Sequence, residues 1–202
     1  MIRIARRIPG VRILADLPRL FARSFAALRR HGPIAAGQYL VDHMVRLSTG
    51  LPPVRYSRIT PQLYVGGQYS RSGLEKLRAR GFTSLINLRE EFDDAEAGIS
   101  LGRYLYLPTV DDHAPTMEDL REGVEFLYEE FARGGKVYVH CMLGVGRSVT
   151  LIAAYLVSRG MTPDEAWRLI RRRRPFIQPT EVQMALIEEW AVLQATHEMV
   201  DG

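Results

Sequence analysis

The chain has 202 residues, of which 47% are hydrophobic and 25% are charged, which is enough for one domain of ordinary size plus a short extension. This composition excludes a wholly disordered chain, a collagen-like repeat and a polytopic membrane protein. The single cysteine, Cys141, excludes a disulfide framework and a metal site built on several thiolates, so we expect a cytoplasmic location. The best apolar run, residues 148–157, is far shorter than the roughly 20 residues of a membrane-spanning helix.

Charge is unevenly distributed along the chain, whose formal net charge is +4. Residues 1–58 carry 11 arginines against Asp16 and Asp42, a net charge of +9, whereas the remaining residues carry −5. A basic arm therefore precedes an acidic body. Such an arm suggests an anionic partner, which is a membrane surface, a nucleic acid or an acidic face of another protein, and the charge alone does not choose among them.

The basic arm has the pattern of an amphipathic helix. Arginines lie on one side of this predicted helix, and apolar residues recur at helical spacing on the other side. The apolar residues are Leu17, Leu20, Phe21, Phe25 and Leu28. This helix either lies in the headgroup layer of a membrane, targets the chain, or packs its apolar side on the body. It lacks the apolar region of a secretory signal because arginines interrupt each apolar stretch. A second helix is expected over 34–47, and the break at 50–53 divides an extension, residues 1–53, from a catalytic domain, residues 54–202.

Strand and helix patterns alternate beyond the break. Strands are expected at 63–65, 83–88, 104–107 and 136–140, and helices at 74–80, from 117 to about 132, up to 159, from 163 to about 174 and from about 180 onward. Thr116 with Asp119, and Thr162 with Glu165, have the spacing of capping boxes. The alternation predicts an α/β fold, a small central and mostly parallel sheet flanked by helices, behind a helical N-terminal extension.

The segment KVYVHCMLGVGRSV, residues 136–149, carries the clearest chemical signal. A buried strand delivers His140 and Cys141 into a loop that leads directly into a helix, so backbone N–H groups and a helix N-terminus converge on one point and form a cradle for an oxyanion. Arg147 closes this loop and can hold two phosphate oxygens. The same positive field lowers the pKa of the thiol and makes it a nucleophile. The phosphate-binding loop itself consists of Met142, Leu143, Gly144, Val145 and Gly146.

These residues resemble the signature loop, His-Cys-x5-Arg-Ser, of the cysteine-dependent protein tyrosine phosphatases, and the resemblance covers about residues 56–190. The segments RITPQLYVGG, SLINLRE and RPFIQPTEVQ look like the compact dual-specificity branch, close to the small atypical group that contains the mitochondrial phosphatidylglycerophosphate phosphatase. The resemblance implies phosphomonoester hydrolysis through a phosphocysteine, with no metal and no cofactor. A buried structural cysteine beside an ordinary turn, and rhodanese-like sulfur transfer, are the alternatives.

Cleavage also needs an acid to protonate the leaving oxygen. Asp111 and Asp112 follow a strand, and because adjacent residues of an extended segment point in opposite directions, one of the two is expected to face the thiol. The Thr-Val-Asp match to the resembled family selects Asp111, and His113 is expected to be an ordinary loop residue. For Ser148 the resemblance implies a hydroxyl that stabilises the thiolate while the phosphocysteine is hydrolysed, alongside the simpler role of a helix cap.

Several further residues are expected to support the site. His140 is predicted to hydrogen-bond nearby backbone and to order the loop. Asn87, Arg89 and Glu90 either brace the segment that carries the acid or line the site. Gln183 or Gln178 is a candidate for positioning the hydrolytic water. The basic run 171–174 is interpreted as cations at a helix C-terminus, where they complement the helix dipole, so no nucleic acid is expected.

The loop residues narrow the range of substrate classes. The apolar loop residues Met142, Leu143 and Val145 argue against multiply phosphorylated inositol lipids, whose phosphatases tend to carry lysine there. Phosphotyrosine, phosphoserine or phosphothreonine proteins are the leading class. A lipid monophosphate such as phosphatidylglycerophosphate is the alternative, with peripheral membrane contact through residues 1–30. A phosphate-binding module without catalysis is a third hypothesis, and the oligomeric state cannot be read from the sequence.

Overall fold

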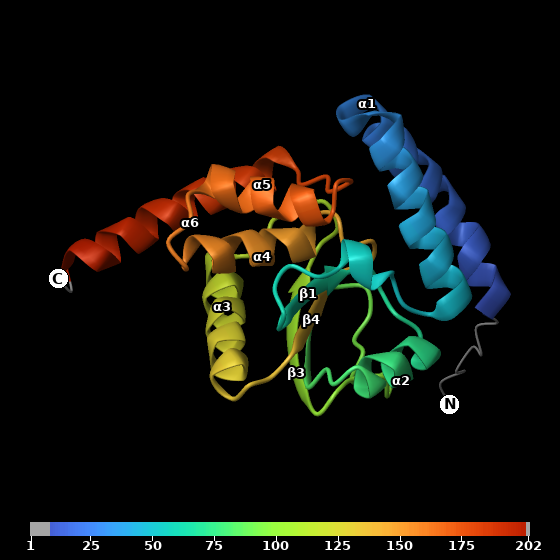
Figure 1. The fold of residues 1–202 in the computed structure, drawn as a ribbon, viewed down its shortest axis with the longest axis horizontal. Helices are drawn as coiled ribbons and strands as arrows, with labels where there is room; N and C mark the ends of the chain where they lie inside the picture. Colours follow the sequence, from blue (N-terminus) through green and yellow to red (C-terminus); the bar gives the residue numbers. More distant parts are fainter. Residues whose placement is uncertain (1–8, 201–202) are drawn as a thin grey trace, which may run out of the picture.

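A parallel β-sheet of four strands lies at the centre of the protein (Figure 1). The computed structural model describes the backbone of residues 9–200 and the side chains of residues 22–196. The strands follow the order β1-β4-β2-β3, and all three pairings are parallel. They are β1 (Leu63–Gly66), β2 (Ser84–Arg89), β3 (Arg103–Thr109) and β4 (Val137–His140). The predicted α/β architecture is confirmed.

Helices cover both faces of this sheet. Side chains alternate along each strand, so Val65, Ile86 and Val139 pack into one core with the C-terminal helices, whereas Leu85 and Tyr138 pack against α2 on the other face. The helices are α2 (Arg71–Ala79), α3 (Met117–Ala132), α4 (Arg147–Val157), α5 (Pro163–Arg173) and α6 (Glu181–Val200). The capping boxes predicted at the starts of α3 and α5 are both present.

The N-terminal extension forms a helical hairpin. Helix α1 spans Pro9–Thr49, but Gly32 has φ 81° and ψ 177°, which breaks the helix in two. Figure 1 shows the chain reversing there, so that the two halves run antiparallel. Glycine suits this reversal because it adopts positive φ without steric cost. The predicted helix over 34–47 is the second half of the hairpin, and the side chains of Leu17, Leu20 and Phe21 lie outside the described residues.

The second half of the hairpin packs on the body. Tyr39 and Asp42 are buried, and the ring of Tyr39 lies 5.6 Å from that of Phe176. Elsewhere the hairpin exposes apolar side chains, among them Ile34, which is 77% exposed, and Phe25, which is 61% exposed. The N-terminal hairpin (residues 9–49) is therefore docked against the sheet domain while part of its apolar surface faces solvent.

Candidate active site

The thiol of Cys141 lies at the carboxyl end of β4, directly below the start of α4. Cys141 is 3% exposed. The backbone N–H of Gly144 donates to its Sγ at 3.3 Å, and the Ser148 hydroxyl lies 3.5 Å from the same sulfur. Gly144 has φ +69°, and a Cβ there would lie 2.2 Å from the carbonyl carbon of Gly66, so this turn of the phosphate-binding loop requires glycine.

The electrostatic environment favours the thiolate. Burial alone would raise the pKa of the Cys141 thiol, but the charge of Arg147, the Ser148 hydroxyl and backbone N–H groups outweigh it and lower the pKa below its ordinary value. The thiol therefore ionises more readily than a free cysteine, as the sequence led us to expect.

The carbonyl groups of the phosphate-binding loop are directed away from its cradle. The Met142 carbonyl accepts from the Gln68 N–H at 3.0 Å, and the Val145 carbonyl accepts from the Gln178 N–H at 2.8 Å. The carbonyls of Leu143 and Gly144 both accept from Arg174. Because the C=O and N–H of a trans peptide point in opposite directions, this pattern turns the loop N–H groups toward the side where the thiol lies.

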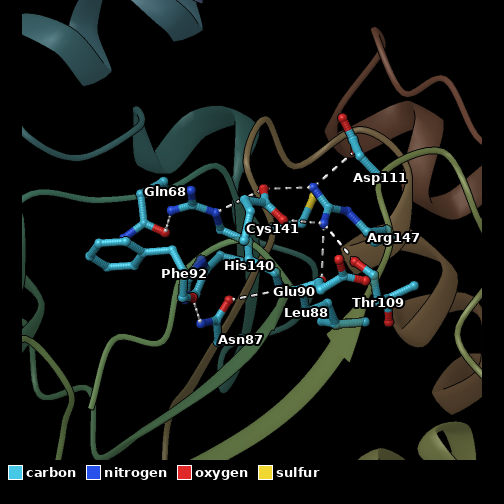
Figure 2. Close-up of polar contacts among 12 residues, drawn as sticks. Gln68, Asn87, Leu88, Glu90, Phe92, Thr109, Asp111, His140, Cys141 and Arg147 are labelled. Carbon is cyan, nitrogen blue, oxygen red and sulfur yellow. Dashed lines mark hydrogen bonds and ion pairs between the residues drawn. The ribbon is translucent and has the colours of Figure 1, made fainter. Parts of the chain in front are cut away.

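Arg147 is held by groups on three segments. Its Nη1 donates to the carbonyl of Thr109 at 2.8 Å and to that of Leu88 at 3.3 Å. Its Nη2 lies 2.9 Å from an oxygen of Asp111. Figure 2 shows the guanidinium beside Cys141, with Asp111 on one side of it and Leu88 and Thr109 on the other. The Nε atom is buried and has no hydrogen-bond partner among the described residues.

Glu91 is a site residue that the sequence analysis missed. Its carboxylate bonds both terminal nitrogens of Arg147, at 2.9 and 3.2 Å, and also accepts from the Nε of Arg89 at 3.1 Å. Burial alone would raise the pKa of Glu91, but hydrogen bonds and the charges of Arg147 and Arg89 lower it to about 2. The sequence singled out its neighbour Glu90, but the contact with Arg147 is made by Glu91. The segment SLINLRE ends at Glu90, so it drew attention to this turn but stopped one residue short of the glutamate that contacts Arg147.

The two adjacent aspartates of the acid loop (residues 110–116) point to different partners. Asp111 lies against Arg147, as expected for the residue that faces the thiol, and its side chain is 43% exposed. Asp112 has φ 64° and pairs instead with Arg23 of the N-terminal hairpin. His113 is exposed, and its ring nitrogen contacts the carbonyl of Asp111. The two side chains diverge as expected, but they do so through a turn at residues 111–112 and not through the predicted extended segment, and Asp111 is the one beside Arg147.

His140 has a different partner from the one predicted. Its Nε2 lies 2.7 Å from the carboxylate of Asp94, and both side chains are fully buried. Asp94 also accepts from the Tyr69 hydroxyl at 2.9 Å and the Gln68 amide at 3.0 Å. The prediction that His140 bonds to nearby backbone is wrong, because the buried carboxylate of Asp94, from the loop after β2, takes its Nε2, and its Nδ1 has no hydrogen-bond partner among the described residues.

Asn87 and Arg89 brace the turn that carries Glu91. The Asn87 amide donates to the Phe92 carbonyl at 2.7 Å, and its oxygen accepts from the Arg89 N–H at 2.9 Å. The Arg89 side chain donates to Gln68 at 2.6 Å and to Glu91. Figure 2 shows this chain of contacts leading to Arg147. Their side chains act on the Glu91 turn, and through it on Arg147.

Gln183 and Gln178 lie close to the loop but have protein partners. The Gln183 amide donates to the carbonyl of His113 at 2.8 Å, and its oxygen accepts from the Thr180 N–H at 3.0 Å. A Cβ on Gly146 would lie 3.0 Å from this oxygen, so Gln183 sits against the loop. The Gln178 side chain donates to the carbonyl of Arg23. Gln183 thus ties the acid loop to the start of α6, and its role toward water stays a prediction.

The basic run at the end of α5 separates into two kinds of residue. Residues 171–173 are exposed, in keeping with the predicted interaction with the helix end, whereas Arg174 is fully buried and donates to the phosphate-binding loop. For Arg174 the predicted interaction with the helix end is wrong, because its side chain turns into the interior, where it pairs with Asp42 of the hairpin.

Two features are absent from the described part of the chain. No helix within it combines the length and apolarity needed to cross a membrane. Within the same residues, no group of three or more histidine, cysteine, aspartate or glutamate side chains is arranged to hold a metal ion.

The fold and the thiol cradle define the class of protein. Residues 63–192 match the sequence model of the family described as "Dual specificity phosphatase, catalytic domain". The chain therefore belongs to this family, and the enzyme class predicted from the sequence, a cysteine-dependent phosphatase of the protein tyrosine phosphatase type, is confirmed.

Individual relatives fall into two groups. "Dual specificity protein phosphatase 1" of Homo sapiens is 33% identical over 123 residues, which cover 60% of this chain and 33% of that protein. "Phosphatidylglycerophosphatase and protein-tyrosine phosphatase 1" of Homo sapiens is 32% identical over 145 residues, 67% of this chain and 72% of that protein. The chain thus spans 33% of the length of this human phosphatase and 20% of the length of "Dual specificity protein phosphatase 8" of Mus musculus, which it also matches.

Solved structures show the same fold. A structure of PTPMT1 in complex with PI(5)P superposes with a TM-score of 0.64 at 27% identity and covers 70% of this chain and 97% of that chain. The active form of Tk-PTP gives a TM-score of 0.61 at 30% identity, with 67% and 95% covered. The predicted closeness to the small atypical group is confirmed by these neighbours together with the curated relatives.

Proposed function

We propose that this protein hydrolyses phosphomonoesters through a phosphocysteine on Cys141. The observation that carries the proposal is the convergence of Gly144 N–H, the Ser148 hydroxyl and Arg147 on one buried thiol whose pKa is lowered. A thiolate beneath a ring of backbone N–H groups has the geometry for attack on a phosphorus atom held in the loop.

The first step transfers the phosphoryl group to sulfur. The Cys141 thiolate forms an S–P bond while the P–O bond to the leaving group breaks, and Asp111 gives its proton to the departing oxygen. Loop N–H groups and the free Nε of Arg147 stabilise the equatorial oxygens. Asp111 must leave its contact with Arg147 to reach the leaving oxygen, so binding of a phosphate to the guanidinium would release the acid for this step.

The second step releases phosphate. Asp111, now ionised, removes a proton from water, the water oxygen bonds to phosphorus and the S–P bond breaks, which returns the electron pair to Cys141. The Ser148 hydroxyl, 3.5 Å from the sulfur, donates to the thiolate as it leaves. The residues that do this chemistry supply the proton, the nucleophile and the charge, so the scheme needs no metal ion.

Phosphorylated proteins are the substrate class we propose first. The side chains at 142, 143 and 145 are apolar, which suits a site for one phosphate carried on a peptide side chain. The names of the first curated relatives, dual specificity protein phosphatases, support the same class.

A lipid monophosphate is the second candidate, and the N-terminal hairpin favours it. Phe25, Ile34 and Met44 are each more than 60% exposed. The one acidic residue between 22 and 50 is Asp42, which is buried and paired, so the exposed charge of this segment is basic. Apolar and basic groups on one exposed element suit an anionic membrane surface. The phosphatidylglycerophosphatase among the relatives supports this candidate.

Phosphate release tests both candidates side by side. The full chain is given a phosphotyrosine peptide or vesicles that contain phosphatidylglycerophosphate, with Cys141→Ser as the blank. Faster release from the peptide assigns a protein phosphatase, and faster release from vesicles assigns a lipid phosphatase at a membrane surface. Release from neither by folded protein, with binding of phosphate retained, would identify a phosphate-binding module and overturn the proposal.

Sedimentation with vesicles isolates the contribution of the hairpin. The full chain is mixed with phosphatidylglycerol or phosphatidylcholine vesicles and compared with a variant that carries Phe25→Ser, Ile34→Ser and Met44→Ser. Binding to the anionic vesicles that the variant loses supports the membrane role. Equal sedimentation of both proteins contradicts it.

A further inference from the structure

We propose that Arg174 and Asp42 are positioning residues of the phosphate-binding loop, so that the N-terminal hairpin completes the site. The inference rests on the proposed function for its meaning in catalysis, but its geometry is independent of turnover. Arg174 lies in the segment after α5, and Asp42 lies in α1, outside residues 63–192 that match the family model.

Arg174 supports the loop from behind. The side chain is fully buried, and its Nε donates to the Gly144 carbonyl at 2.6 Å while its Nη2 donates to the Leu143 carbonyl at 3.0 Å. Nη1 donates to the carbonyl of Tyr56 at 3.0 Å. A rigid guanidinium can hold two neighbouring carbonyls at once, which a single lysine nitrogen cannot reproduce.

The two carbonyls belong to peptide units whose N–H groups line the cradle. Leu143 C=O and Gly144 N–H form one trans unit, and the N–H end of that unit donates to the sulfur of Cys141 at 3.3 Å. Gly144 C=O shares the next unit with the N–H of Val145. Since the two ends of a trans peptide point in opposite directions, each bond from Arg174 aims one loop N–H toward the thiol and its oxyanion.

Asp42 compensates the buried positive charge of Arg174. Its two oxygens lie 3.0 and 3.1 Å from Nη1 and Nη2 of Arg174, and Asp42 is 3% exposed. A buried guanidinium without a counter-charge is strongly unfavourable, so removal of the carboxylate should drive Arg174 out of its position behind the loop.

Packing contacts also hold Arg174 and the phosphate-binding loop against the hairpin. The guanidinium carbon of Arg174 lies 4.5 Å from the ring centre of Phe176. Phe176 in turn packs edge-on against Tyr39 of the hairpin and forms a cluster with Val145 of the loop. The hairpin therefore reaches the loop both by charge and by contact.

The experiment measures the thiol and the cradle without turnover. Full-length Asp42→Asn and Arg174→Lys are compared with wild type for the pH at which iodoacetamide alkylates Cys141 and for protection of Cys141 by inorganic phosphate. We expect the alkylation midpoint to rise in both variants, and the phosphate concentration for half-protection to rise about tenfold, because loop N–H groups are no longer aimed at sulfur and oxyanion. Arg172→Gln, at an exposed position, is the matched control and should match wild type.

The outcomes separate a positioning role from a structural one. If either folded variant unfolds at lower urea but keeps the wild-type alkylation midpoint and phosphate protection, the pair only stabilises the fold and the proposal is overturned. Asp42→Glu, which keeps the charge, should restore part of the phosphate protection. Because alkylation needs no substrate turnover, an inactive wild type would overturn the proposed function while leaving this result readable. If Asp42→Asn fails to fold, Arg174→Lys carries the same comparison.

Discussion

Glu91 holds Arg147 by both of its carboxylate oxygens, at 2.9 and 3.2 Å from the two terminal nitrogens. This bidentate contact occupies one edge of the guanidinium and leaves the buried Nε without a partner among the described residues. Arg89 and, behind it, Gln68 fix the glutamate in turn. The turn after β2, outside the signature loop, thus helps to orient Arg147, the residue that we propose meets the phosphate.

Replacement of Glu91 by glutamine should therefore weaken catalysis with the fold kept. Glutamine has the same shape but accepts at one oxygen and carries no charge, so Arg147 is free to rotate. We expect kcat/KM for p-nitrophenyl phosphate to fall about tenfold to a hundredfold, the scale of losing one charge-assisted hydrogen bond in a pair. Glu90→Gln, at the exposed neighbour, is the control. Equal activity of both variants would show that Glu91 does not orient Arg147.

The general acid can be tested with its own neighbour as control. Asp111→Asn removes the proton donor, so we expect kcat to fall by a factor of about 10²–10⁴, with a larger loss for alkyl than for aryl phosphates because a poor leaving group needs the proton more. Asp112→Asn should retain activity, since asparagine tolerates the φ of 64° there. Measurement of kcat for both substrates decides the assignment, and an equal loss in both variants would argue against it.

Much of the fold could be predicted because its signals are local. Each capping box is contained within one helical turn, and both occur as expected, one at Thr116 and Asp119 and the other at Thr162 and Glu165. The placement of Cys141 and Arg147 at the two ends of one loop was predictable for a similar reason, since this loop is one continuous segment between a strand and a helix.

The parts that escaped prediction depend on long-range pairs. Glu91 meets Arg147 across 56 positions, and Arg174 meets Asp42 across 132. Nothing in the spacing near Glu91 distinguishes it from Glu90. The run of arginines at 171–174 also looks uniform, although α5 ends within it and turns the last of them inward. Such contacts follow from the packing of segments far apart in the chain.

Ser148 should act on the second chemical step. Its hydroxyl helps to lower the pKa of the Cys141 thiol, so Ser148→Ala raises that pKa and makes the thiolate a poorer leaving group. We expect the phosphocysteine to accumulate, which appears as a burst of p-nitrophenol followed by a slower steady rate, and as protein carrying one phosphoryl group after an acid quench. Ser158→Ala, at the other end of α4, should show no burst. Absence of a burst in both would assign Ser148 to capping alone.

Acid stability depends on the buried pair of Asp94 and His140. Burial alone would raise the pKa of Asp94, but His140 and the hydrogen bonds from Gln68 and Tyr69 lower it below its ordinary value. A carboxyl whose folded pKa is depressed adds stability above its unfolded pKa, near 3.9, and loses it as the pH falls through the folded value. Asp94→Asn should therefore lower the free energy of unfolding by about 3 kcal/mol at pH 7, and the difference from wild type should narrow below about pH 4.

Urea unfolding at several pH values, followed by circular dichroism, measures this difference directly. Glu96→Gln, which changes an exposed carboxyl on the same loop, controls for the removal of a negative charge and should shift the unfolding midpoint little. A constant difference between wild type and Asp94→Asn from pH 7 to pH 3 would mean that the Asp94 carboxylate is not the titrating group, and that its contribution comes from packing. A difference that narrows with acid would instead identify the ionised Asp94 carboxylate as the group that stabilises the base of the phosphate-binding loop.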